Sequence, residues 1–170
     1  MNRILTKKWN GWNSLAGEGI FPKSDGDTAY ASDFNRINIK MASATWTTAF
    51  STTSTSYVDV TDATVTLSGL DAAETYDLYA IATGSLSNAT ATAYTYVQMV
   101  IDGTATTDFS HNVTGADTDY SFNIHGFKST VTGATSYIAK LQSKVGSGTG
   151  KINRPAVETC RITLIAFPKW

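Results

Sequence analysis

The sequence predicts an all-β protein, an antiparallel sandwich of eight or nine short strands that follows an N-terminal arm. After residue 41, short segments alternate apolar and polar side chains, and turn formers separate them at regular spacing. Charged residues make up 16% of the chain, below the roughly 25% of an ordinary soluble protein. Threonine and serine take their place, and threonine, being β-branched, fits a pleated surface. At 170 residues the chain suits one domain with a short appendage.

Residues 1–41 are predicted to be an attachment arm without a core of its own, because glycines and turn formers interrupt them. One short helix is expected within residues 31–41, where Ser32 or Asp33 caps it. The arm's rings must be buried on the chain's own sandwich, on a sister subunit or on a different protein, and we favour the last two surfaces. The apolar face of that helix is expected to be Phe34, Ile37 and Met41. The aromatic residues expected to dock are Trp9, Trp12, Phe21, Tyr30 and Phe34.

The sandwich is predicted to occupy residues 42–170. A loop rich in serine and threonine, 51–56, and turns at 62–63 and 68–71 separate its early strands. A small-residue loop at 84–92 joins the two most apolar segments. The strands predicted in this half are 45–50, 57–60, 64–67, 75–83 and 94–101.

In the second half, Asp102-Gly103 is a tight-turn signal that closes the strand 94–101. Residues 104–117 are polar and are expected to form a loop, apart from a short piece at 109–113. A turn at 132–134 and a glycine-rich loop at 146–150 separate the remaining segments. The strands predicted there are 119–127, 136–145, 151–153 and 159–167.

Three predicted strands, 75–83, 94–101 and 159–167, carry large apolar or aromatic groups on both faces. A half-exposed strand is ordinarily apolar on one face only. One face of each strand is expected to fill the core, and the other to lie against another copy of the chain. Stacking on sugars is an alternative use for the tyrosines among them, since both roles exploit a large rigid apolar ring. The expected interface residues are Tyr79, Ile81, Tyr94, Tyr96, Gln98, Ile165 and Phe167.

Charge is distributed unevenly along the chain although the formal net charge is −1. Residues 1–41 hold six Lys or Arg and four acids, residues 42–127 hold nine acids and no Lys or Arg, and residues 128–170 hold seven basic residues and one acid. These blocks can neutralise each other within one fold, meet across a subunit interface, or simply face solvent. No dense basic stripe is interleaved with aromatics, so no nucleic-acid partner is expected.

No catalytic motif is found, and no enzyme activity, metal or cofactor is expected. His111 and His125 lack the further ligands that a zinc site needs, and they are interpreted as surface histidines. The acidic loop with Asp117 and Asp119 is interpreted as a turn, with calcium binding left open. Cys160 lies in an apolar strand and is expected to be a buried thiol.

No segment reaches the roughly 18–20 apolar residues of a membrane helix, so no membrane partner is expected. The N-terminus has no apolar core of the kind that makes a signal peptide. The protein is therefore expected to be made in a cytoplasm and to be assembled there or released by lysis.

Several stretches together resemble a known family. The stretches that carry this similarity are Trp46, 53–60, 65–67, 76–85, 100–104 and 164–168. They are similar to the jelly-roll domains of viral fibres, head spikes and decoration proteins. These stretches also resemble trimeric tumour-necrosis-factor-like jelly rolls. Residues 26–35 look like the start of many phage tail and virion proteins, in which an attachment segment precedes the body. The resemblance implies a homotrimer with its inner sheet around a threefold axis and its arm docked on the particle.

The expected function is that of a non-enzymatic virion structural protein, a trimeric decoration or fibre-type protein. It would be assembled in the host cytoplasm and anchored to capsid or tail proteins through residues 1–41. The alternative is the receptor-binding or glycan-binding head of a viral fibre, with a host surface glycan as its partner. A cellular sandwich domain of unrelated role is a third reading.

Overall fold

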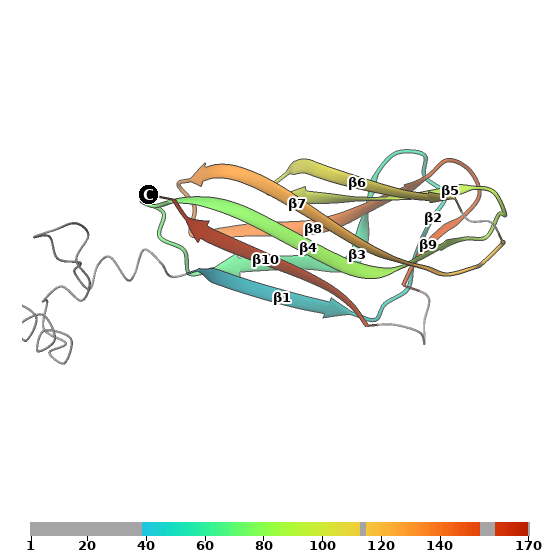
Figure 1. The fold of residues 1–170 in the computed structure, drawn as a ribbon, viewed down its shortest axis with the longest axis horizontal. Helices are drawn as coiled ribbons and strands as arrows, with labels where there is room; N and C mark the ends of the chain where they lie inside the picture. Colours follow the sequence, from blue (N-terminus) through green and yellow to red (C-terminus); the bar gives the residue numbers. More distant parts are fainter. Residues whose placement is uncertain (1–38, 113–114, 154–158, 170) are drawn as a thin grey trace, which may run out of the picture. The chain divides into compact units, whose positions relative to one another are not determined.

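The computed structural model describes residues 39–112, 115–153 and 159–169, and these form a two-layered β-sandwich (Figure 1). All regular structure in these residues is β-strand. No helix in the described part of the chain is long and apolar enough to span a membrane. The strands are β1 (Lys40–Trp46), β2 (Phe50–Thr52), β3 (Val58–Ser68), β4 (Thr75–Asn88), β5 (Tyr94–Ile101), β6 (Thr104–Asn112), β7 (Tyr120–Thr132), β8 (Ser136–Val145), β9 (Gly150–Ile152) and β10 (Cys160–Pro168).

The strands form two antiparallel sheets, which we call sheet A and sheet B. Sheet A has the order β1-β10-β4-β9-β2, and β7 also pairs with β4, outside this order. Sheet B has the order β3-β8-β5-β6. Setting aside the short β2 and β9, the long strands have the order β1-β10-β4-β7 in sheet A and β3-β8-β5-β6 in sheet B. The chain changes sheet between successive long strands except from β5 to β6, and this is the arrangement of a jelly roll. The structure thus confirms the predicted all-β antiparallel sandwich.

The core lies between the sheets, and strict alternation along the strands builds it. In β4, Leu78, Ala80 and Ala82 are fully buried, and the residues between them are only partly covered. Val97 and Met99 of β5 supply the facing layer from sheet B. Because side chains of a strand alternate between its two faces, one apolar residue in every two is enough to fill this interior. Cys160 is buried within it, as the sequence predicted.

Two strands have the predicted bounds, and the turn after the first is also as predicted. β5 runs from Tyr94 to Ile101 and β8 from Ser136 to Val145. Asp102 and Gly103, which join β5 to β6, have φ values of 47° and 74°. Positive φ at both central residues is the geometry of the hairpin turns that match the right-handed twist of paired strands.

Several predicted boundaries were wrong. Residues 104–112, expected to be mostly loop, form strand β6 at the edge of sheet B. The turn expected at 62–63 is an irregularity within the single strand β3, where the register with β8 shifts and Asp62 has a φ of 63°. β4 continues through five residues that were assigned to a loop, Gly84–Asn88.

The start of the sandwich also differs from the prediction. Lys40 and Met41, assigned to the end of a helix in the arm, begin strand β1 and pair with Ala166 and Ile165 of β10. The predicted first strand at 45–50 is instead the end of β1 and the beginning of β2. The remainder of the arm, residues 1–38, lies outside the described residues, as do its predicted helix and docking rings.

Ion pairs join parts of the chain that have opposite charge. Within the described residues, four acids of the segment 42–127 pair with four lysines of the segment 128–170. The first and last charge blocks of the sandwich therefore neutralise each other within one subunit, which was one of the three arrangements considered. The pairs are Asp102–Lys128, Asp59–Lys140, Asp117–Lys151 and Asp77–Lys169.

The sandwich has two distinct ends (Figure 1). Lys40 pairs with Ala166, so the first and last strands begin and finish at one end, which we call the terminal end. The opposite end, which we call the loop end, carries the connections 89–93 and 146–149 between strands. Exposed apolar, aromatic and charged side chains are distributed over these ends and over the two outer faces.

Candidate interaction surfaces

A row of apolar side chains crosses the outer face of sheet A. Met41 of β1 is paired with Ile165 of β10, Ile165 with Tyr79 of β4, and Tyr79 with Phe127 of β7. Directly paired residues of an antiparallel sheet project from the same face, so the four side chains lie side by side. Met41 is 65% exposed and Phe127 is 54% exposed. We call these four residues the apolar row.

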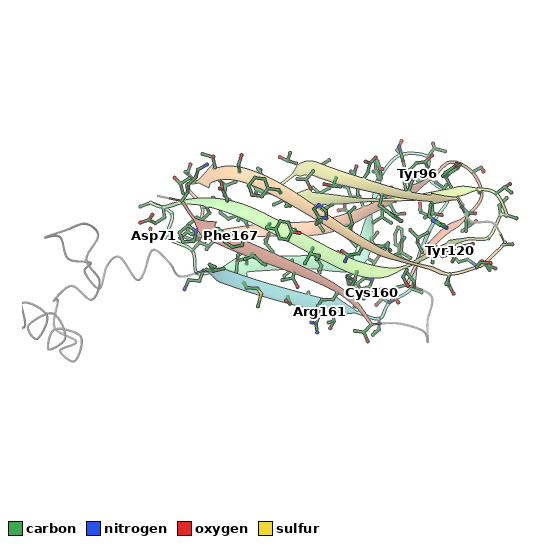
Figure 2. All side chains as sticks on the ribbon, viewed as in Figure 1. Asp71, Tyr96, Tyr120, Cys160, Arg161 and Phe167 are labelled. Carbon is green, nitrogen blue, oxygen red and sulfur yellow. The ribbon has the colours of Figure 1, made fainter. Side chains whose placement is uncertain are left out.

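Further apolar groups extend this row towards the terminal end. Ile39 and Phe167, both exposed, lie at the start of β1 and the end of β10. Figure 2 shows Phe167 near the terminal end of the sandwich. On the other side of the row, Ile81 follows Tyr79 on the outer face of β4, and the imidazole of His125 stacks on the Tyr79 ring at 6.0 Å. We call the apolar row together with Ile39, Ile81 and Phe167 the sheet A patch.

Three charged residues near this patch, Asp77, Lys128 and Lys169, are paired within the subunit. Lys128, next to Phe127 on β7, donates to Asp102 at 2.8 Å. The carboxylate of Asp77, next along the outer face of β4 from Tyr79, accepts from the Thr130 amide at 2.8 Å and lies 3.5 Å from the Lys169 ammonium. A surface covering the patch therefore does not need to supply a charge to these groups.

The outer face of sheet B carries a polar row instead. Asp59 of β3 is paired with Gln142 of β8, Gln142 with Gln98 of β5, and Gln98 with Asp108 of β6. The two amides are joined at 2.6 Å, and Gln142 also donates to Asp59 at 2.7 Å. Lys140 donates to the other carboxylate oxygen of Asp59 at 2.7 Å. These hydrogen bonds hold the pKa of Asp59 below its ordinary value, the bond from Lys140 being the largest cause.

An aromatic cluster follows the polar row towards the loop end. The Lys144 ammonium lies 4.5 Å from the centre of the Tyr57 ring and 5.0 Å from that of Tyr96, both cation–π distances. Tyr94 stacks on Tyr96 with ring centres 5.9 Å apart. The Tyr57 hydroxyl donates to Asp108 at 3.5 Å. Burial, followed by the negative charge of Asp108, raises the pKa of Tyr57 to about 12.

The residues predicted to form the subunit interface do not lie on one face of the sandwich. One part of the set lies on the outer face of sheet A, and the other part lies on the outer face of sheet B, which points the opposite way. The part on sheet A is Tyr79, Ile81, Ile165 and Phe167, and the part on sheet B is Tyr94, Tyr96 and Gln98. β4 and β5 belong to different sheets, and the sequence pattern did not reveal this.

Sequence reasoning also missed two members of the apolar row, Met41 and Phe127. Met41 was assigned to a helix, which hid its place on an edge strand. Phe127 has the same parity as the polar residues Asn123 and His125 of strand β7. A phenylalanine among the outward-facing residues of this strand was the signal that could have identified Phe127 as part of an exposed apolar surface.

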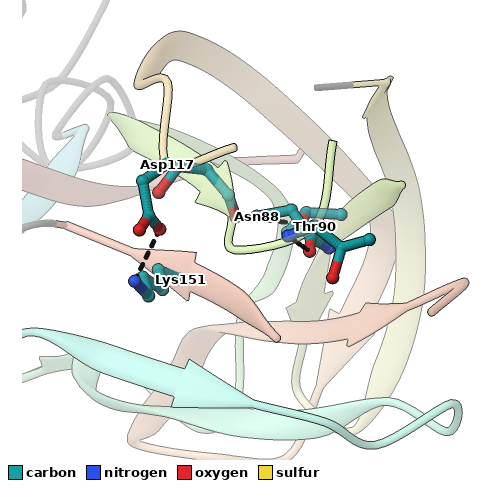
Figure 3. Close-up of polar contacts among 6 residues, drawn as sticks. Asn88, Thr90, Asp117 and Lys151 are labelled. Atoms are coloured by element: carbon teal, nitrogen blue, oxygen red, sulfur yellow. Dashed lines mark hydrogen bonds and ion pairs between the residues drawn. The ribbon is translucent and has the colours of Figure 1, made fainter. Parts of the chain in front are cut away.

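The two histidines and the acidic loop have local roles in packing. The imidazole of His111 contacts the Tyr120 ring with centres 3.9 Å apart. The carboxylate of Asp117 pairs with the Lys151 ammonium at 2.6 Å (Figure 3). Within the described residues, no group of three or more His, Cys, Asp or Glu is arranged to hold a metal ion.

Asn88 organises the loop end (Figure 3). Its fully buried amide donates to the Thr95 hydroxyl at 3.2 Å and to the Ser147 carbonyl at 3.1 Å, and its side-chain oxygen accepts from the Thr90 amide at 2.9 Å. Its carbonyl accepts from the Asp117 amide at 2.7 Å. One side chain thus joins the connections 89–93 and 146–149 to strand β5, which fixes the backbone beside the aromatic cluster.

No family model matches the chain, and no curated protein matches it. Among solved structures, it is similar to the dimeric latent PorU of Porphyromonas gingivalis, with 7% identity and a TM-score of 0.46, over 75% of this chain and 12% of that one. It is also similar to a chain of the Bacillus endospore appendages, a family of disulfide-linked pili, with 14% identity and a TM-score of 0.33, over 76% of this chain and 90% of that one.

A third similar chain comes from the structure of the infectious bursal disease virus Gt strain, with 14% identity and a TM-score of 0.35, over 91% of this chain and 42% of that one. The similar structures thus include a virus and a pilus-like appendage. The present chain spans only a small part of the PorU chain. At these identities and TM-scores, none of the three decides what the protein does.

Proposed function

We propose that this protein is a non-enzymatic structural protein of a virion, and that it assembles with copies of itself through the sheet A patch. The observation that carries this proposal is the apolar row, Met41, Ile165, Tyr79 and Phe127, which crosses four strands on an outer face. Contiguous exposed apolar groups are uncommon on a soluble monomer and are typical of contact surfaces. Covering them contributes about 25 cal/mol for each Å² of apolar area removed from water.

A second copy of the chain is the cover that suits this face. The neighbouring charges of Lys128, Asp77 and Lys169 already have partners within the subunit, so an apolar surface can cover the patch without leaving these three groups unpaired. The patch itself is such a surface. Most soluble oligomers consist of identical subunits in closed symmetry, and the buried centres of their interfaces are rich in aromatic residues and methionine.

Three subunits around a threefold axis are the arrangement we propose, following the likeness to trimeric jelly rolls. The part of the arm that precedes the sandwich, residues 1–38, then anchors the trimer to capsid or tail proteins through Trp9, Trp12, Phe21, Tyr30 and Phe34. Since Lys40 lies at the terminal end, the three arms of a trimer would leave from the same end. Three linked arms gain affinity through effective concentration without new contacts. Assembly would occur in the host cytoplasm.

A second candidate function is the glycan-binding or receptor-binding head of a viral fibre. The stacked rings of Tyr94 and Tyr96 favour it, because they lie on sheet B and are therefore not used by an interface on sheet A. The two candidates are compatible, since one concerns the outer face of sheet A and the other that of sheet B.

Light scattering of the full chain over a range of concentrations tests the assembly. We expect the mass of a trimer, and a monomer at every concentration would contradict the proposal. Removing residues 1–38, which precede strand β1, tests the arm. The shortened protein should remain a trimer and should no longer bind purified particles, while any glycan binding is retained.

A further inference from the structure

We propose that the surface formed by Tyr94, Tyr96 and Lys144, at the loop end of sheet B, binds a saccharide that carries a carboxylate. This inference deepens the second candidate function and does not depend on the proposed assembly. We call these three residues the tyrosine–lysine site.

The rings supply a flat apolar floor. Tyr94 is 43% exposed and stacks on Tyr96, with an interplanar angle of 28°. Gly146 lies against both tyrosines, and a Cβ there would be 3.6 Å from the Cβ of Tyr94 and 3.8 Å from a ring carbon of Tyr96. Because glycine has no side chain, nothing from this position covers the rings. The C–H face of a pyranose packs on a ring exposed in this way, since a large rigid aromatic face offers apolar contact at little cost in side-chain entropy.

The ammonium beside these rings supplies the charge preference. Within the described residues, Lys140 of the same face is paired with Asp59, whereas Lys144 has no carboxylate within 4.0 Å and is held only by ring faces. The nearby carboxylate of Asp108 accepts the Tyr57 hydroxyl. A ligand carboxylate would give Lys144 the anionic partner it lacks, and hydrogen bonds in which both groups are charged are roughly twice as strong as neutral ones.

The surroundings hold this arrangement before a ligand arrives. Gln98 and Gln142, next along the outer faces of β5 and β8, are locked to each other at 2.6 Å. The Gly146 amide donates to the Tyr94 carbonyl at 3.0 Å, and Asn88 fixes the connection that contains Ser147. Preorganisation of this kind reduces the entropy lost on binding. The site lies at the loop end, where Figure 2 shows Tyr96, whereas Lys40, the first residue of β1, lies at the terminal end.

Saturation-transfer NMR on the full-length protein tests the proposal, with 3′-sialyllactose as the acidic probe and lactose as its neutral counterpart. We expect saturation of the sialic acid protons, and binding of sialyllactose at least about tenfold tighter than that of lactose. Tyr94→Ala should weaken sialyllactose binding by about tenfold or more. Lys144→Gln should bring sialyllactose down to the level of lactose. Gly146→Val should weaken both probes by covering the rings.

Ile138→Ala is the matched control, because it removes an exposed apolar side chain from the same outer face of sheet B, outside the tyrosine–lysine site. It should leave sialyllactose binding unchanged, and thermal unfolding should show that Tyr94→Ala is folded. Absence of saturation with both sugars would overturn the proposal. Equal binding of the two sugars would overturn the role given to Lys144. Light scattering on the same samples keeps the results separate, since a monomer that binds sialyllactose contradicts the proposed assembly and a trimer that binds neither sugar contradicts only the saccharide site.

Discussion

Each outer face of the sandwich is crossed by a row of four side chains, one from each of four neighbouring strands, and the two rows differ in chemistry. On sheet A the row is Met41, Ile165, Tyr79 and Phe127, and on sheet B it is Asp59, Gln142, Gln98 and Asp108. The polar row forms hydrogen bonds within itself and is stable in contact with water. No such hydrogen bonds join the side chains of the apolar row, and its large apolar groups are in contact with water.

This difference is the reason why we propose contact through one face of the sandwich and not through the other. A self-bonded polar row loses its hydration if another subunit covers it, and each hydrogen bond that it makes contributes only about 0.5–1.5 kcal/mol. An apolar row gains free energy in proportion to the area that a partner covers. We therefore assign self-association to sheet A and leave the outer face of sheet B open to solvent or to a small ligand.

A charge placed on the outer face of sheet A should dissociate the oligomer, whereas a charge placed on the outer face of sheet B should not. We expect this to be the largest effect. Phe127→Lys puts an ammonium in the apolar row, where burying it in an interface without a partner costs several kcal/mol. The oligomer should dissociate to a folded monomer, measured by light scattering and circular dichroism. Ile138→Lys is the matched control, because Ile138 is exposed to a similar degree on sheet B. If Ile138→Lys dissociates the oligomer and Phe127→Lys does not, the interface lies on sheet B and the proposal of an interface on sheet A is wrong.

The inner faces, in contrast to the outer ones, should behave alike. Leu164 of β10 and Leu141 of β8 are both fully buried, one in each sheet. Leu164→Ala and Leu141→Ala should each lower the free energy of unfolding by about 2–5 kcal/mol, from lost apolar transfer and the cavity left behind. Chemical denaturation at a fixed protein concentration measures this. A loss below about 1 kcal/mol for either variant would show that the two sheets do not share one tightly packed core.

The polar row should contribute a smaller, pH-dependent stabilisation. The folded pKa of Asp59 lies below its ordinary value of 3.8, so the stabilisation is fully present above that value and is lost as the pH falls through the folded pKa. Because the pair with Lys140 is exposed, Asp59→Asn should cost less than about 1 kcal/mol at pH 7. Thermal unfolding of both proteins from pH 7 to pH 2 measures the difference. A difference that persists at pH 2 would show that the charge of Asp59 is not its cause.

The ionisation of Tyr57 should have the smallest effect on stability at neutral pH, because this group titrates only at high pH. Its folded pKa of about 12 lies above the ordinary 10.0, so its contribution to stability is fully present below pH 10 and is lost as the pH rises towards 12. Tyr57→Phe removes the ionisable group and should therefore lose less stability than the original protein between pH 10 and 12. Unfolding curves across this range measure the effect, and parallel losses in the two proteins would contradict it.

Local patterns were enough to locate some strands and not others. β5 and β8 were predicted with their observed bounds because each alternates clearly and lies between turn formers. β6 was missed because it is a threonine-rich edge strand, with Phe109 as its largest apolar group. In β4, Ser85 and Ser87 are buried although they resemble loop residues. Gly84 leaves room for neighbouring side chains, since a Cβ there would lie 2.7 Å from the Cys160 sulfur.

The candidate surfaces were harder to predict than the strands. The outward residues of β4, β5 and β10 were recognised as too apolar for ordinary exposed faces, and the structure places Tyr79, Ile165 and Phe167 of this set on the outer face of sheet A. It did not show that Tyr94 and Tyr96 lie on the other sheet. Parity along a strand tells which residues share a face of that strand, but it does not tell which sheet the strand joins.

The sequence by itself determined the all-β class, the inward half of each strand and the separation of charge along the chain, because each follows from local periodicity or composition. The tertiary structure alone decided which outward residues lie together. Met41, Tyr79, Phe127 and Ile165 are far apart in the sequence and become neighbours only when β1, β10, β4 and β7 pair. In a jelly roll these pairings are made between distant strands, so the surfaces that depend on them are absent from any local pattern.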